Sequence, residues 1–456
     1  MRTKSTTQRY LNFFLPSSST KVVAAYRKKY GALNDLLVAN PQVLDLVHAD
    51  FCRCLSASDS GRESRYTSEE ILRVLVVMFV EGDSYRDVVV RIENSEFLRE
   101  FIGLGFYKPM MDFSFVAKAF SALSANTWEA LNLSLSRYAK EEALISGDKL
   151  RTDTTAYETN IHYPTDSSLL WDAYRVLCRI LRRVQIEVPL LGLMHRYHDK
   201  KVKKLAYSIA RNAKSTSKAT QREVKRAYRK LIERVRWITG VSKEVQQLLE
   251  QALLTVPELE KYTPTVERII SQAERRVFHG EVVPAGEKVY SLFEDHTELL
   301  VRGKAGKRVE FGHKVLIAQT GEKFISHYRV LPKREEDKDL VDETLEAHRE
   351  LFGQLPEVFA GDKGFYGGVK KLKELEKKIE TVSICKKGRR TEAEQVREHS
   401  EAFRDGQRFR AGVEGTISVL KRAFKLNRCL FKGFKNFAAS VGCAVFCHNL
   451  VLLSQQ

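Results

Sequence analysis

Three charged residues near the end of the chain recur at helical spacing: Arg410, Glu414 and Lys421, separated by four and seven positions. At about 100° per residue, their side chains fall within roughly 40° of one another on a helix, beside an apolar stripe. One carboxylate therefore lies between two cations along a buried face. A solvated salt-bridge face would show the same spacing, so the pattern alone leaves both interpretations open.

Two isolated aspartates upstream could extend that carboxylate into a metal site. Asp153 lies in LRTDTTAYET and Asp362 lies in EVFAGDKGFYG, both in strand-and-turn settings. Three carboxylates brought together would offer hard oxygen ligands, which Mg²⁺ accepts. Two such ions can activate an oxygen nucleophile and stabilise a leaving oxygen in phosphodiester transfer.

This constellation resembles the catalytic triad of bacterial insertion-sequence transposases of the DDE type. In that family the glutamate helix carries an Arg, a Glu four residues later and a Lys seven residues after the Glu, which Arg410, Glu414 and Lys421 match. The family's tyrosine three residues before the arginine is Gln407 here. The glycine and aromatic residues that follow Asp362 are also common after the family's second aspartate.

The resemblance extends over most of the chain, from about Tyr66 to Leu450. The runs ETNIHYPTDSSLLWD and RGKAGKRVEFGHKV look like segments of one subgroup, the transposases often labelled ISNCY. It implies an α/β fold: an RNase H-like mixed sheet with flanking helices, interrupted by a helical insert and preceded by an all-α N-terminal domain.

The resemblance also implies a mechanism. Asp153 would bridge two Mg²⁺ ions, with Mn²⁺ as a substitute, while Asp362 and Glu414 would each hold one. Water would cut at the transposon end, and the freed 3′-hydroxyl would then attack target DNA. Arg410 and Lys421 would contact phosphates or orient Glu414. The implied partners are double-stranded DNA, as terminal inverted repeats and target, and further copies of the chain in a homodimer or higher oligomer.

Two alternatives stay open at this point. One is a metal-dependent DNA nuclease that cuts without joining strands, and the other is a DNA-binding derivative that has lost catalysis. Among the other carboxylates, Asp166 is expected to be a helix N-cap. Glu335, Glu336 and Asp337 are expected to form a solvated loop before a helix.

The composition points to a polyanionic partner. The 456 residues carry a formal net charge of +18, with 43% hydrophobic and 29% charged residues. A positive potential of this size recruits phosphate backbones and releases their counterions. We found no uninterrupted apolar run of transmembrane length and no signal-peptide core in the sequence, so we expect a cytoplasmic protein that uses no membrane.

Most of the positive charge lies in one segment. Residues 173–240 hold 19 lysines and arginines against four carboxylates, a net of +15. Apolar positions recur there at helical spacing with cations between them. A solvated coiled-coil face usually alternates the sign of its charges, whereas this one does not, so DNA backbone contact is favoured. The expected contact residues are Arg222, Lys225, Arg226, Arg229 and Lys230.

The remaining pattern predicts the order of elements. Strands are expected within 288–301, 313–319, 356–361 and 381–385, and helices over 338–352, 367–378 and 408–425. Thr67 and Glu70 predict a capping box before an apolar helix, followed by a turn at Gly82. The strand around Asp153 is expected from the resemblance alone. Four segments follow: a helical domain for DNA ends (1–145), two parts of the catalytic core (146–172 and 281–456), and a basic helical insert (173–280).

Overall fold

The structure is a computed structural model that describes residues 2–5, 20–55, 64–105, 107–301 and 308–456. The chain divides into two compact units, which we describe separately. The core unit comprises residues 1–158 and 313–456, and the helical unit comprises residues 159–312.

The core unit begins with helices that bury their apolar residues in a shared core. The first of the N-terminal helices to be strongly apolar, α3, is held at its start by the expected capping box: the Thr67 side chain accepts from the Glu70 N–H, and the Glu70 side chain accepts from the Thr67 N–H. The turn at Gly82 then leads into α4, as expected. These helices are α1 (Lys21–Ala39), α2 (Pro41–Leu55), α3 (Ser68–Val80), α4 (Tyr85–Glu93), α5 (Glu96–Ile102), α6 (Phe113–Ala122) and α7 (Ala125–Glu141).

A mixed sheet and its flanking helices form the rest of the core unit, although residues 298–301 and 309–312 of the sheet fall within the helical unit. The strand order is β2-β3-β1-β5-β6, with β4 paired to β3 and β7 to β1. β1 and β6 each run parallel to β5, whereas β4 and β2 run antiparallel to β3. The strands are β1 (Lys149–Thr159), β2 (Glu298–Val301), β3 (Val309–Thr320), β4 (Ile325–Val330), β5 (Val358–Gly361), β6 (Thr381–Ile384) and β7 (Arg428–Cys429).

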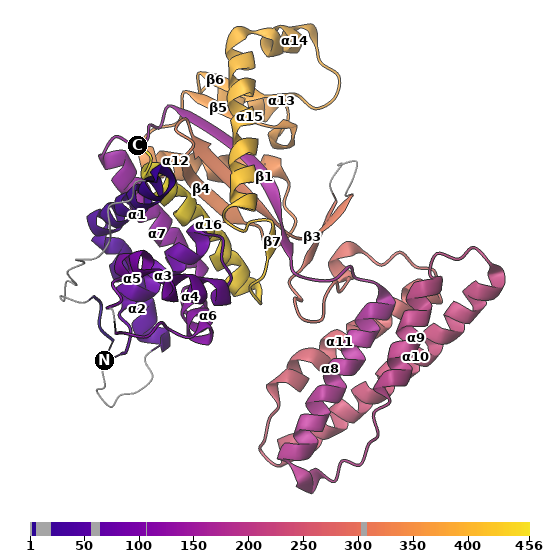
Figure 1. Ribbon diagram of the computed structural model, residues 1–456. Coiled ribbons are helices and arrows are strands. Elements are labelled where there is room, and N and C mark those ends of the chain that lie inside the picture. Colours follow the sequence, from indigo (N-terminus) through magenta and orange to yellow (C-terminus); the bar gives the residue numbers. More distant parts are fainter. Residues whose placement is uncertain (1, 6–19, 56–63, 106, 302–307) are drawn as a thin grey trace. The chain divides into compact units, whose positions relative to one another are not determined.

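Helices from the C-terminal half pack on this sheet. In Figure 1, α15 lies across the strands, and its backbone lies nearest to β5 and β6. Short 3-10 turns precede α12 and follow β5. These elements are η3 (Asp337–Leu340), α12 (Val341–Phe352), η4 (Lys363–Phe365), α13 (Val369–Glu376), α14 (Glu392–His399), α15 (Glu401–Arg422) and α16 (Phe434–Leu453).

Among the described residues, one helix is long and apolar enough to cross a membrane: α16. Most of its length, 78% of the apolar window, is buried inside the fold. It packs against α7 and α3, so its apolar residues serve the core of this unit.

The helical unit is built from four helices that run side by side (Figure 1). They surround a core of their own, whose largest contributions come from leucine, isoleucine and valine. The helices are α8 (Asp166–Glu187), α9 (Asp199–Asn212), α10 (Lys218–Gln251) and α11 (Pro257–Val277). β2 and the first residues of β3 add a hairpin to this unit.

Asp166 has a different role from the expected N-cap. The cap of α8 is Thr165, whose side chain accepts from the Ser168 N–H. Asp166 is the first helical residue and is buried, where it receives hydrogen bonds from Gln272 (3.0 Å) and Arg276 (2.7 Å) of α11. Its carboxylate thus ties the start of α8 to α11.

The two compact units divide the chain differently from the four expected segments. One continuous hydrophobic cluster joins the N-terminal helices with β3, β4, α15 and α16, so these helices do not have a core separate from the sheet. The helical unit also starts before residue 173, because α8 begins at Asp166 and already buries Leu169 and Leu170.

Several element boundaries also differ from expectation. The expected strand over 288–301 is confined to its last four residues, because Val289 and Leu292 pack into the helical core instead of a ladder. The expected helix over 408–425 begins earlier, at Glu401. The expected strands over 313–319, 356–361 and 381–385 are present as β3, β5 and β6.

Candidate active site

Asp153 lies in the middle of β1, next to β5, which ends directly before Asp362. The parallel register pairs Leu150 with Phe359 and Arg151 with Ala360. Two further steps of this register bring Asp153 opposite Asp362, with both side chains on the same face of the sheet. The expected strand around Asp153 is therefore present.

The two aspartates are each held by a backbone donor. Asp153 Oδ1 accepts from the Thr154 N–H at 2.7 Å, and Asp362 Oδ1 accepts from the Gly364 N–H at 2.7 Å. The second bond makes Asp362 the N-cap of η4. One oxygen of each carboxylate is thereby fixed in direction.

The pKa of Asp153 is raised to about 6, chiefly because burial disfavours the charged form. The negative charges of Asp362 and Asp337 contribute to this rise. The Thr154 N–H and the Arg410 guanidinium act in the opposite direction. A carboxylate with such a pKa and like-charged neighbours is typical of functional sites and of metal sites in particular.

Glu414 projects from α15 and pairs with Arg410. Its Oε1 lies 3.2 Å from Arg410 Nη2, and its side chain is 64% exposed against 21% for the arginine. Arg410 therefore binds Glu414 while its charge acts on Asp153. Lys421 lies on the last turn of the same helix.

α15 approaches the sheet closely because glycines face it. A Cβ on Gly412 would come within 2.0 Å of Arg151 Nη1, and a Cβ on Gly406 within 2.4 Å of the Ser383 Cβ. Gln407 occupies the position three residues before Arg410, where the family pattern has a tyrosine. Its Nε2 donates to the Ser383 carbonyl at 2.7 Å. The helix is thus seated on β1 and β6.

A buried polar network links the Asp153 strand to the Glu414 helix. Arg151 donates to the Phe409 carbonyl of α15 and to Gln319 Oε1 of β3, both at 2.7 Å. Gln319 Nε2 in turn donates to Thr416 Oγ1 of α15 at 2.8 Å. Three elements are therefore fixed relative to one another around the candidate triad.

The structure brings the candidate residues together only in part. Among the described residues, no group of three His, Cys, Asp or Glu side chains is close enough to hold a metal ion as it stands. Asp153 and Asp362 are neighbours, whereas Glu414 is engaged by Arg410. The donor set is nevertheless all carboxylate, which suits Mg²⁺ or Mn²⁺ rather than a softer metal.

Asp337 lies beside the candidate site, although the sequence did not single it out. It begins η3, which packs against η4, and it is largely buried instead of solvated. Its Oδ1 accepts from Thr154 Oγ1 at 3.1 Å and from Lys314 Nζ at 2.7 Å. Only the acidic run before a helix marks it in the sequence, and that pattern is common on surfaces.

The cations of the helical unit differ in whether they are paired with carboxylates. Several of those in the second half of α10 and in α11 are paired, such as Arg236 with Glu274 at 2.7 Å and Lys243 with Glu267 at 2.5 Å. Those of α9, the following turn and the first half of α10 are exposed, and no carboxylate of the described residues lies within salt-bridge distance of them. They are Lys200, Lys201, Lys203, Lys204, Arg211, Lys214, Lys218, Arg222, Lys225, Arg226, Arg229, Lys230 and Arg234.

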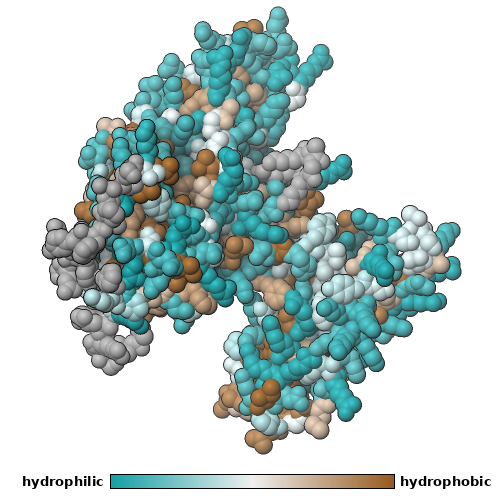
Figure 2. Space-filling model, in the orientation of Figure 1, coloured by the Kyte–Doolittle hydropathy of each residue, from teal (hydrophilic) through white to brown (hydrophobic). Residues whose placement is uncertain are grey.

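Figure 2 shows that hydrophilic residues dominate the visible face of the helical unit. Its apolar exposure is concentrated where α8 and α10 end, with Ile186, Leu190 and Leu253 all more than three-quarters exposed. That end carries glutamates and no lysine or arginine between 186 and 194 or between 244 and 260. The unpaired cations thus occupy a separate region of the unit.

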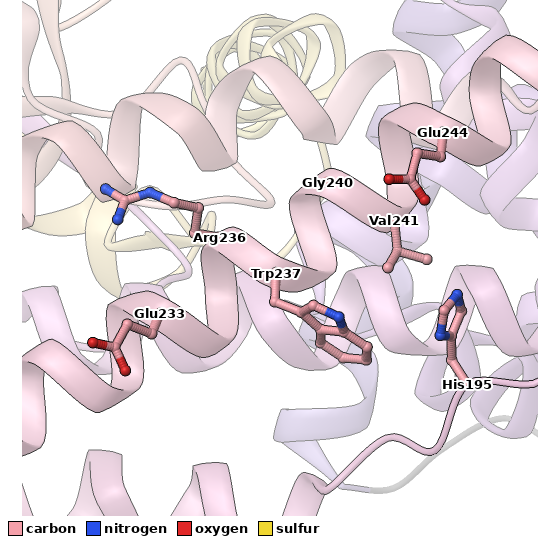
Figure 3. Close-up of a pocket in the computed structure, with 7 residues that line it drawn as sticks. All are labelled: His195, Glu233, Arg236, Trp237, Gly240, Val241 and Glu244. Atoms are coloured by element: carbon pink, nitrogen blue, oxygen red, sulfur yellow. The ribbon is translucent and has the colours of Figure 1, made fainter.

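A pocket of about 440 Å³ also lies in the helical unit. Figure 3 shows Trp237 of α10 beside His195 from the loop before α9, with Glu233 and Glu244 on the same helix as Trp237. The pocket is lined by neither Asp153 nor Asp362, so it is not part of the candidate active site.

Residues 292–450 match the family model described as Transposase DDE domain. Searches of curated proteins and of solved structures gave no match. The matched segment contains Asp337, Asp362, Arg410, Glu414 and Lys421 but not Asp153.

Proposed function

We propose that the protein is a DNA transposase of an insertion sequence, because residues 292–450 match the family model described as Transposase DDE domain. In this proposal it cleaves the ends of its element and joins the freed 3′-hydroxyls to target DNA. The mixed α/β sheet is compatible with an RNase H-like domain preceded by a helical region. The subgroup suggested by the sequence remains part of the proposal.

The observation that carries the proposal is the pairing of Asp153 with Asp362 beside the Glu414 helix. The family match covers the second and third acidic residues only. Asp153 comes from outside the match, yet its strand is the direct neighbour of β5, which ends directly before Asp362. An acidic residue from outside the matched segment thus lies at the same edge of the sheet as Asp362, which supports one site formed by both residues.

Members of the family generally use divalent metal ions, and the residues fit such an ion. Asp153 and Asp362 supply hard oxygen ligands on one edge of the sheet, and Glu414 would complete the set once it leaves Arg410. The bound ions, Mg²⁺ or Mn²⁺, would activate the attacking oxygen and stabilise the leaving one. Asp153 is suited to such a site, because a nearby cation would offset the cost of its charge.

The chain's own residues then have distinct roles. In the first step the oxygen of water attacks the phosphorus at the transposon end, the bond to the 3′-oxygen breaks, and that oxygen takes up a proton. In the second step the freed 3′-oxygen attacks a target phosphate and the target 3′-oxygen leaves. Arg410 and Lys421 would hold phosphate oxygens, and Arg410 would exchange Glu414 for phosphate as DNA enters.

The unpaired cations of α9 and α10 supply a second contact with DNA in this proposal. Arg222, Lys225, Arg226, Arg229 and Lys230 lie on the exposed face of α10. Because they have no carboxylate partners, no salt bridge has to break before they bind phosphates. Both terminal repeats have to be cut, so we further propose that the protein acts as a dimer or higher oligomer on DNA in the cytoplasm.

Cleavage of end DNA tests the proposal directly. The substrate is a duplex that carries the inverted repeat found in the DNA flanking the gene, with a supercoiled plasmid as target and Mg²⁺ present. Wild-type protein should release the end and join it to the plasmid, while Asp153→Asn, Asp362→Asn and Glu414→Gln should bind the duplex without cutting it. Cutting without joining would favour the nuclease alternative, and an inert wild type that still binds the ends would favour the non-catalytic derivative.

A further inference from the structure

Asp337 meets the candidate site from an element that the triad does not include. It stands at the start of η3, and its carboxylate reaches β1 through Thr154 and β3 through Lys314. Thr154 directly follows Asp153, and its N–H holds the Asp153 carboxylate. Asp337 is therefore connected to Asp153 through a single residue.

The two oxygens of Asp337 have different surroundings. Oδ1 takes the hydrogen bonds from Thr154 and Lys314. Oδ2 lies 2.6 Å from the point that a Cβ on Gly364 would occupy, and Asp362 Oδ1 lies 2.7 Å from the same point. Oxygens of two carboxylates thus converge on the space that is left open by a glycine.

Gly364 has no backbone reason to be glycine, because its φ is not in the left-handed region. What excludes a side chain is the pair of carboxylates. Like charges held this close repel one another unless a cation lies near them. Lys314 partly neutralises Asp337, but it binds Oδ1 and not the Oδ2 that lies near Gly364.

From this geometry we propose that Asp337 is a further acidic residue of the metal-binding edge, where it helps Asp153 and Asp362 to hold a divalent cation such as Mg²⁺ or Mn²⁺. Oδ2 supplies an oxygen and negative charge on the Asp362 side, while Lys314 and Thr154 fix the carboxylate through Oδ1. This assignment rests on the proposed function and adds a residue to the proposed site.

Divalent-ion binding by the full-length protein, measured without DNA, tests the assignment. Mn²⁺ and Mg²⁺ are titrated by calorimetry and by the metal-dependent rise in melting temperature. Asp337→Asn keeps the side-chain volume and can still accept the hydrogen bond from Thr154, so the substitution removes mainly the negative charge. We expect divalent-ion binding to weaken about tenfold or more. Asp339→Asn, the same change two residues later on an exposed position, is the matched control and should bind as wild type does.

For Lys314→Met we expect the opposite effect on divalent-ion binding. Removing the cation leaves Asp337 more negative, so divalent binding should tighten. If Asp337 only supports the fold, both variants should weaken binding or leave it unchanged. Because Lys314→Met tests the role of Asp337 independently, the assignment can be tested even if Asp337→Asn does not fold.

The outcomes separate the two proposals. Wild type that binds the ions, with Asp337→Asn equal to Asp339→Asn, would overturn the role of Asp337 and leave the proposed function intact. Wild type that binds neither ion would overturn the metal chemistry of the proposed function and the role of Asp337 together.

Discussion

At Asp153, burial and neighbouring carboxylates favour the protonated acid, while metal chemistry would require the charged form. Its pKa of about 6 in the folded protein compares with about 4 for an exposed aspartate. The charged form at neutral pH therefore destabilises the fold unless a cation is bound. Such local costs are common where function and stability compete.

This gives a signed prediction for Asp153→Asn. Above pH 6 the wild-type carboxylate is charged in a site that disfavours the charge. The free energy of unfolding of the variant should therefore be about 1 to 3 kcal/mol higher than that of the wild type. As the pH falls from 6 to 4 the folded protein takes up the proton and the difference should shrink, and below about pH 4 it should vanish. Urea denaturation at a series of pH values measures it.

Metal provides the control for that experiment. Mg²⁺ or Mn²⁺ should stabilise the wild-type protein at pH 8 and leave Asp153→Asn unchanged, so that the two curves approach each other. A variant that is less stable than wild type at pH 8 without metal would contradict the account of Asp153 as a costly charge.

Individual site residues differed in how well the sequence could reveal them. Glu414 and Arg410 follow from helical spacing, and their salt bridge is present. Asp153 could not be found from composition, because its strand buries Thr152 and Thr155 instead of a run of apolar residues. Asp337 was wrongly expected in a solvated loop, because only tertiary contacts with Thr154 and Lys314 distinguish it from a surface acid.

At the scale of elements, the seating of α15 depends on which of its glycines face the sheet. Gly412 and Gly415 lie one turn apart on the same helix. A Cβ on Gly412 would collide with Arg151, whereas nothing lies within 4 Å of a Cβ on Gly415. Helix propensity favours alanine at both positions, so the packing alone should decide the outcome.

We therefore expect opposite signs from two identical substitutions. Gly412→Ala should displace Arg151 from its buried hydrogen bonds and lower the free energy of unfolding by about 2 kcal/mol or more. Gly415→Ala should raise it by about 0.5 to 1 kcal/mol. Chemical denaturation of both proteins at one pH is sufficient, and equal effects would show that α15 is not seated through Gly412.

Elements were predictable where local pattern and tertiary role agree. The two agree for the capping box before α3 and for the strands β3, β5 and β6, which the sequence predicted and the structure contains. The start of α15 at Glu401 was missed because its apolar stripe is clear only further along, while its first turns are anchored by Gly406 and Gln407. The predicted strand before β2 was wrong because its apolar residues are used by another core.

The cations of α10 give a prediction for DNA binding by the intact protein. Replacing Arg222, Lys225, Arg226, Arg229 and Lys230 with Gln should weaken binding to every sequence alike and flatten the slope of log affinity against log salt. Each lost phosphate contact contributes about 0.9 to that slope. Fluorescence anisotropy with specific and random duplexes at several salt concentrations measures both quantities.

The matched control removes five cations that are already paired with carboxylates. Arg182, Arg183, Arg236, Lys243 and Arg275 changed to Gln lower the net charge of the unit equally. If both variants flatten the slope to the same extent, the effect is one of total charge, and the exposed face of α9 and α10 is not a specific phosphate-binding surface.

At the scale of the whole molecule, the chain leaves one core after β1, builds another and returns through β3. The helical unit has its own hydrophobic cluster, which includes residues just beyond both ends of the expected insert. Leu169 and Leu170 precede residue 173, and Val289 and Leu292 follow residue 280. The sequence placed the insert by its positive charge, and charge does not mark where a core begins.

Two fragments of the helical unit should therefore behave differently. Residues 160–297 contain the whole core together with Asp166 and its partners on α11, so this fragment should unfold in one cooperative, strongly helical transition. Residues 173–280 lack the first two turns of α8 and the segment that contains Val289, which leaves Arg276 without its carboxylate and apolar surface uncovered. We expect this shorter fragment to melt at least about 10 °C lower or to aggregate. Circular dichroism of both fragments during heating provides the measurement, and equal melting temperatures would show that the added segments contribute nothing to the unit.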